Sequence, residues 1–211
     1  MNKSDSKKSI ALIAETNFVL DIAFEQSDEC SRLLDFIHKN NISLVIPEYA
    51  FAEAEGSILD KLRNRLAAID LALTALRQAS RSAYSTLADF IIQLEQYKNE
   101  IERTELHLVQ ERKRELEKNS TLIPFTPELM VKAELRRLKD VAPFKQTDRV
   151  IYESILEFAK LNKDSNIQMI FLTRDKNDFN FTFIREELAS LNIELFYSAG
   201  DCIKRFMELI Q

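Results

Sequence analysis

The sequence predicts an α/β fold in which a parallel sheet is combined with an inserted pair of long helices. Short apolar runs, which are typical of buried strands, alternate along the chain with stretches in which apolar residues recur every three or four positions. Such alternation is typical of parallel strands joined by right-handed helical crossovers. In the middle of the chain one long stretch has the helical pattern alone, and only two glycines occur in all 211 residues.

The first part of the chain predicts two strands separated by a helix. Ser9–Ala14 is a short apolar run and predicts the first buried strand. Helical spacing follows in Cys30–His38, and a second apolar run, Ile42–Ile46, predicts the second strand. Pro47 would end that strand, and Glu48–Glu55 would begin a helix with the proline near its first turn.

From Ser57 to about Lys118 the apolar residues recur in two successive stripes of helical spacing. We interpret them as two long antiparallel helices that form a hairpin of coiled-coil character. One continuous helix is the alternative. The charge run Glu111–Glu115 predicts a solvated helix face.

The last part of the chain returns to alternating strands and helices. Thr121–Pro127 holds two prolines and predicts a loop. The elements expected after it are a helix over Glu128–Lys139, a helix from Val150 that Thr147 or Asp148 would cap, a strand over Ile167–Leu172, a helix around Ile184–Leu191, a strand over Ile193–Tyr197 and a terminal helix over Cys202–Ile210.

Composition excludes several classes of function. Gly56 and Gly200 cannot form a glycine-rich loop that cradles phosphates, and the two histidines belong to no catalytic or metal-binding motif. Cys30 and Cys202 have no metal-ligand spacing, which fits a reducing compartment. Neither a secretory leader nor an apolar run long enough to span a membrane is present, so we expect a soluble, cytoplasmic protein without a membrane partner. The net charge of −5 disfavours broad, nonspecific binding of nucleic acid.

Carboxylates recur where the predicted strands end and where helices begin. Because these ends share one edge of a parallel sheet, five acids can converge there: Glu15, Glu53, Asp148, Asp175 and Asp178. Gathered carboxylates repel one another unless a cation lies among them, and Mg²⁺ or Mn²⁺ prefers such oxygen ligands. Each acid also has a simpler interpretation, since Asp148 could be a helix cap and Glu53 could face water. Thr16 and Asn17 could be turn residues or could hold the first carboxylate by hydrogen bonds.

Four segments carry a family resemblance. They are Ala14-Glu15-Thr16-Asn17, Ile46-Pro47 with Glu53, Thr147-Asp148 with Leu156-Glu157-Phe158-Ala159, and Phe171-Leu172-Thr173-Arg174-Asp175-Lys176-Asn177-Asp178-Phe179. In order and spacing they resemble the four acidic motifs of PIN-domain nucleases. The resemblance covers about 9–56 and 141–211. It implies a single domain, a three-layer α/β/α sandwich on a parallel sheet, with a helical insertion at about 57–140.

The resemblance also implies an activity and a set of residues. PIN domains bind Mg²⁺ or Mn²⁺ through an acidic quartet and cleave RNA, and many are toxins paired with an antitoxin. By resemblance, Glu15, Glu53, Asp148 and Asp175 take the quartet's places. Asp178 would be an additional or substitute ligand, and Thr173 would support the loop. We assign metal binding to Glu15, Asp148, Asp175 and Asp178, while Glu53 would orient water or bind a second ion.

Two departures from the family pattern keep an alternative open. Glu15 stands where the family usually has an aspartate, and the last motif has one more residue between Asp175 and Asp178 than is common. A catalytically weak or inactive PIN-like protein that acts as a regulatory or assembly module through its insertion is therefore the second hypothesis. The partners that we expect besides an RNA substrate are an antitoxin or another protein, and a second copy of the chain that would dimerise through the insertion.

Basic residues accumulate in Lys132–Arg149 and suggest a contact with an RNA backbone. A solvated helix face is the alternative for this stretch. The residues that we expect at RNA are Arg136, Arg137, Lys145 and Arg149.

Overall fold

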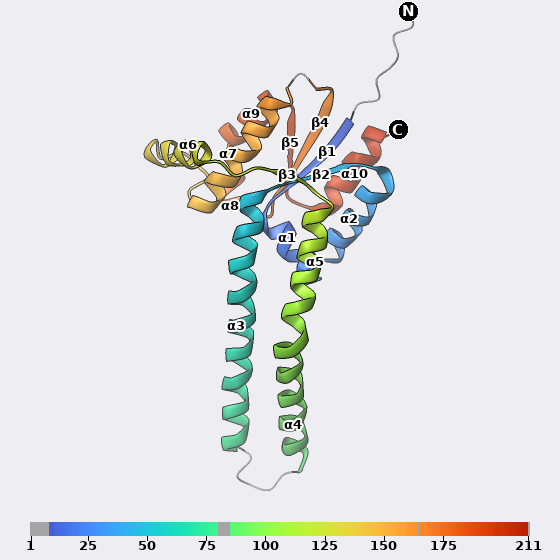
Figure 1. Ribbon diagram of the computed structural model, residues 1–211, viewed down its shortest axis with the longest axis vertical. Coiled ribbons are helices and arrows are strands. Elements are labelled where there is room, and N and C mark those ends of the chain that lie inside the picture. Colours follow the sequence, from blue (N-terminus) through green and yellow to red (C-terminus); the bar gives the residue numbers. More distant parts are fainter. Residues whose placement is uncertain (1–8, 80–84, 164, 211) are drawn as a thin grey trace, which may run out of the picture.

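The computed structural model describes residues 9–79, 85–163 and 165–210 (Figure 1). Within these ranges one sheet has the strand order β3-β2-β1-β4-β5, and every pairing is parallel. The strands are β1 (Ser9–Ala14), β2 (Ser43–Pro47), β3 (Thr121–Ile123), β4 (Ile167–Leu172) and β5 (Ile193–Phe196). The predicted parallel α/β sheet is confirmed.

Helices cover both faces of this sheet. On one side α2 (Asp28–Asn40) lies beside α10 (Ala199–Ile210), and the rings of Phe36 and Phe206 stack 6.3 Å apart (Figure 1). The other side carries α6 (Pro127–Leu138), α7 (Gln146–Leu161) and α9 (Thr182–Ser190). The predicted three-layer sandwich is therefore confirmed.

Strand β1 occupies the centre of the sheet, and Leu12 and Ile13 are fully buried on it. Ala14 at its end pairs with Leu172 at the end of β4. A short helix follows each of these two strands: α1 (Thr16–Ala23) begins two residues after β1, and α8 (Lys176–Phe179) follows β4 after the loop Thr173–Asp175. The residues after Ala14 and Leu172 consequently emerge next to each other at the carboxyl edge of the sheet.

The predicted loop at Thr121–Pro127 is partly wrong. Its first three residues form β3, which pairs with β2 through Val45↔Thr121 and Pro47↔Ile123. Three residues are too few to produce an apolar alternation, and backbone pairing at the edge of a sheet requires no particular side chain. A strand of the sheet thus lies within the range 57–140 that was expected to be an insertion.

The predicted helical hairpin is present and projects away from the sheet (Figure 1). Its first arm is α3 (Glu48–Ala79), which continues the helix predicted at Glu48–Glu55 without a break. The second arm consists of α4 (Ser85–Glu100), the π-helical turn η1 (Ile101–Glu105) and α5 (Leu106–Lys118). One continuous helix, the alternative interpretation, is wrong.

Ion pairs join the two arms along their length. Glu55 pairs with Lys113 at 2.7 Å near the sheet, and Asp70 pairs with Lys98 at 2.8 Å further out. Arg65–Glu105 and Arg77–Glu95 are two further pairs of this kind. Positions rise along one arm as they fall along the other, which is the arrangement of an antiparallel pair.

The charge run at Glu111–Glu115 is only partly the solvated face that we expected. Glu111 is exposed, whereas the Lys113 side chain is 13% exposed and Arg112 bonds the carbonyl of Ala23 and pairs with Glu25. Lys113 thus joins the two arms of the hairpin, whereas Arg112 attaches the hairpin to the end of α1 and the turn that follows it. Among the helices that the structure describes, none is both long and apolar enough to cross a membrane.

Candidate active site

Three of the five predicted acids meet at the carboxyl edge of the sheet. Asp148 lies in the first turn of α7, Asp175 is the N-cap of α8, and Asp178 lies within α8. One carboxylate oxygen from each lies within 4.8 Å of the other two, so a single cation could contact all three. This cluster joins the third and fourth acidic segments of the sequence.

The ammonium group of Lys145 lies among these three carboxylates. Its Nζ is 2.9 Å from Asp178 and 3.4 Å from Asp148, and it also bonds Asp175. Hydrogen bonds to Asp175 and Asp178 raise the pKa of Lys145 above its ordinary value. A cation of the protein itself thus neutralises part of the charge of the cluster.

Local hydrogen bonds position Asp175 and Asp178. The Asp175 carboxylate accepts from the backbone N–H groups of Asn177 and Asp178, which caps the short helix α8. Asp178 accepts from the backbone N–H of Phe144 at 2.8 Å. Burial acts to raise the pKa of Asp178, but Lys145 and the Phe144 N–H outweigh it and hold that pKa below its usual range.

Asp148 has the least compensated carboxylate of the cluster. Its buried Oδ2 forms no hydrogen bond with any residue that the structure describes, and the Lys145 ammonium lies 3.4 Å away. Burial raises the pKa of Asp148 to about 7, Lys145 opposes that rise, and the charges of Asp178 and Asp175 add to it. An additional cation at this place would relieve the unfavourable ionisation.

This raised pKa predicts that the metal-free protein loses stability as pH rises. An aspartate in an unfolded chain has a pKa of about 3.9, so between that value and about 7 the folded state binds the Asp148 proton more tightly. Stability present below this window is lost as pH rises through it. We expect the melting temperature in a chelator to fall between pH 5 and pH 8, and less steeply in Asp148→Asn. Equal slopes for the two proteins would contradict the assignment.

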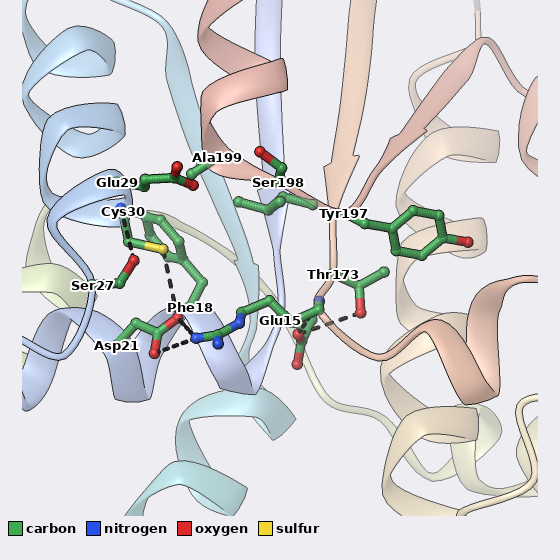
Figure 2. A pocket seen from close by; sticks show the side chains of 12 residues that line it. Glu15, Phe18, Asp21, Ser27, Glu29, Cys30, Thr173, Tyr197, Ser198 and Ala199 are labelled. Atoms are coloured by element: carbon green, nitrogen blue, oxygen red, sulfur yellow. Dashed lines mark hydrogen bonds and ion pairs between the residues drawn. The ribbon is translucent and has the colours of Figure 1, made fainter.

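Glu15 lies next to this cluster, but its carboxylate is satisfied by donors of the protein. Asn17 donates from its backbone N–H at 2.9 Å and from its side chain at 3.0 Å. The Thr173 hydroxyl and the Arg174 backbone N–H donate at 3.4 Å each, and Figure 2 shows Glu15 and Thr173 facing each other. Burial raises the pKa of Glu15. The longer side chain therefore ties the start of α1 to the loop after β4.

Thr173 connects Glu15 to the aspartate cluster. Its hydroxyl accepts from the backbone N–H of Asp175 at 3.0 Å and donates to Glu15. Glu53, on α3, accepts a hydrogen bond from the Thr16 hydroxyl. The supporting residues Thr16, Asn17 and Thr173 thus hold acids in place, and Glu15 and Glu53 form a second acidic group beside the three aspartates.

Comparison with known families agrees with this arrangement. The family model for the PIN domain matches residues 12–179. The chain belongs to the PIN-domain family. Among curated proteins, none matches the sequence significantly. PIN domains are generally nucleases and typically use divalent metals, and the carboxylate cluster of this PIN domain fits that chemistry.

Of the four basic residues that we expected at RNA, two bond other groups in the interior of this PIN domain. The Arg136 side chain is 11% exposed and bonds Glu153 at 2.7 Å and Glu187 at 3.1 Å. Arg149 is buried and donates to the carbonyl of Phe144. Neither is placed to reach a phosphate. A sequence displays the charge of a side chain but not the partner that the fold gives it.

The other two expected contacts have different surroundings. Arg137 is half exposed and pairs with Glu134 on its own helix, so it forms part of a solvated face. Lys145 lies at the aspartate cluster. Of the four residues expected at RNA in Lys132–Arg149, Arg136 and Arg149 are thus enclosed by protein groups, and an RNA contact by Arg137 or Lys145 stays a prediction.

Sequence reasoning missed the pair formed by Arg174 and Asp21. Arg174 contacts both carboxylate oxygens of the buried Asp21, at 2.8 and 2.6 Å. The Cys30 thiol lies 3.5 Å from Asp21 (Figure 2). Arg174 lies directly between Thr173 and Asp175, so its position in the last acidic segment was the available signal. The pair fixes α1 against the loop after β4.

Proposed function

We propose that this PIN domain is a metal-dependent endoribonuclease that hydrolyses phosphodiester bonds at the aspartate cluster. The observation that carries the proposal is the position of the Lys145 ammonium, which acts as a stand-in for a cation among Asp148, Asp175 and Asp178. Oxygen ligands alone, with none from histidine or cysteine, favour Mg²⁺ or Mn²⁺ over softer metals.

The five acidic residues have three roles in this proposal. Asp148, Asp175 and Asp178 would hold the ion, which when bound would activate water and neutralise charge on the scissile phosphate. Glu15, to which the sequence assigned metal binding, is in this proposal a positioning residue that keeps Asp175 in place through Thr173. Glu53, held by Thr16, would orient the attacking water.

Partners and location belong to the same proposal. RNA is the substrate, and an antitoxin or a second copy of the chain would bind the helical hairpin. Both cysteines are free and buried, which suits a reducing cytoplasmic compartment. The alternative is a PIN-like assembly module without activity. The Glu15 carboxylate accepts from four donors of the protein, and this favours the alternative if, against the role proposed above, catalysis requires Glu15 itself to bind the metal.

Calorimetric titration of Mn²⁺ into the wild type and Lys145→Gln tests the proposal. Mn²⁺ must displace the ammonium group, so removing that competitor should lower the dissociation constant of Mn²⁺ by about tenfold, or about 1.4 kcal/mol. Gln keeps a side chain of similar length without charge. Lys160→Gln, on the exposed end of α7, is the matched control and should bind as the wild type does.

Cleavage completes this test. The wild type should cleave RNA in the presence of Mg²⁺ or Mn²⁺, and cleavage should stop when a chelator is added. Absence of Mn²⁺ binding in both the wild type and Lys145→Gln would exclude the metal-dependent mechanism.

A further inference from the structure

A polar groove of about 540 Å³ opens beside Asp175. This volume is within the range of ligand-binding clefts. Its walls come from the start of α1, the hairpin helix α3 and the loop that continues β4 into α8. The charged residues of its lining are Asp21, Lys61, Arg174, Asp175 and Lys176.

The cations of this groove outnumber its acids. Asp21 is neutralised by Arg174, and Asp175 is neutralised by Lys145, which lies outside the lining. Lys61 and Lys176 are exposed, and neither forms an ion pair with any residue that the structure describes. Lys61 lies over the ring of Phe24 at 5.5 Å, and Lys176 lies over the ring of Tyr197 at 5.7 Å. Two uncompensated positive charges therefore flank the approach to the aspartates, although the whole chain has a net charge of −5.

A second hollow beside Glu15 has the opposite character. It lies across the Asp21–Arg174 pair from the groove, holds about 160 Å³, and has Glu15, Asp21 and Glu29 in its wall (Figure 2). Arg174, its one cation among the lining residues, is already paired with Asp21. This small acidic hollow would repel a phosphate, so the groove at Lys61 and Lys176 is the better route for a polyanion.

We propose that the sugar-phosphate backbone of single-stranded nucleic acid lies along this groove, with Lys61 and Lys176 contacting its phosphates. The inference rests on the proposed nuclease function, since the groove leads to the aspartates that would cut the strand. Lys61 belongs to α3, so the hairpin supplies part of the substrate site. The side-chain amides of Asn17, Gln26 and Asn177 line the same groove and can bond sugar hydroxyls and base edges.

Fluorescence anisotropy with a labelled single-stranded RNA in a chelator tests the groove without cleavage. Lys61→Gln and Lys176→Gln should each weaken binding by about fivefold at 0.1 M salt and lower the slope of log K against log salt by about 0.7. Lys163→Gln removes the same charge in the loop between α7 and β4, at the opposite edge of the sheet, and should bind as the wild type does.

Parallel measurements separate the two proposals. Single-stranded DNA of the same sequence should show the same fivefold loss of affinity, because RNA and DNA both carry backbone phosphates. A loss of affinity confined to RNA would overturn the assignment of Lys61 and Lys176 to phosphates. Unchanged RNA affinity in Lys61→Gln and Lys176→Gln would overturn the proposal that nucleic acid binds in the groove. If these variants still bind Mn²⁺, the nuclease proposal stands without the groove. Absence of Mn²⁺ binding in the wild type instead removes the nuclease proposal on which the groove rests.

Discussion

Asp178→Asn is expected to lower RNA cleavage by more than about 100-fold. Changes in groups that merely orient metal ligands typically cost 10- to 100-fold in affinity or activity, so the loss of a proposed ligand charge should cost more. Asn retains an oxygen that can accept the 2.8 Å hydrogen bond from the Phe144 N–H. The fold should therefore persist, and the loss should come from the missing charge. Cleavage rates in Mn²⁺, measured beside melting temperatures, provide the check.

Asp140→Asn is the matched control for this variant. Asp140 is exposed, and its φ of 52° is a conformation that Asn adopts readily. The same change in charge outside the cluster should leave cleavage intact. If Asp178→Asn cuts RNA at the wild-type rate while folded, the aspartates are not the catalytic site. If the wild type does not cut RNA at all, the assembly-module alternative is favoured.

The fold was largely predictable because its signals are local. Each central strand is an apolar run bounded by polar residues. The first and last residues of β1 and β4 are those that the sequence predicts. Strand β3 escaped because it has three residues and is defined by its pairing with β2 rather than by its composition. The hairpin was predictable from its two apolar stripes, but its cross-arm ion pairs depend on a register that spacing alone does not fix.

The site was predictable in its acids and not in its cations. Strand ends indicate which carboxylates share an edge, and three of the five converge on one point while Glu15 and Glu53 lie beside them. Arg136 and Lys145 were assigned to RNA because sequence displays charge without partners. Their carboxylate partners come from other elements: Glu153 and Glu187 for Arg136, and chiefly Asp175 and Asp178 for Lys145. Lys61 reaches the groove only because α3 runs past α1, which a local pattern cannot reveal.

Arg136→Ala is expected to lower the free energy of unfolding by about 3 kcal/mol, because it leaves the Glu153 carboxylate buried without its cation. The Glu153 side chain is only 9% exposed, and Arg136 also bonds the Ala142 carbonyl and lies 4.8 Å above the ring of Tyr152. One substitution thus removes several contacts between α6, α7 and α9. Urea unfolding of the variant and the wild type measures the loss.

Arg137→Ala, at the neighbouring position, separates this structural role from a contact with RNA. Arg137 is half exposed and pairs only with Glu134 among the described ion pairs, so its removal should change the free energy of unfolding by no more than about 0.5 kcal/mol. If Arg136 instead bound RNA, Arg136→Ala would weaken RNA binding and leave stability near the Arg137→Ala value. A large loss of stability in Arg136→Ala, with little change in RNA affinity per folded molecule, would establish that Arg136 holds α6, α7 and α9 together. RNA would then be bound at other residues.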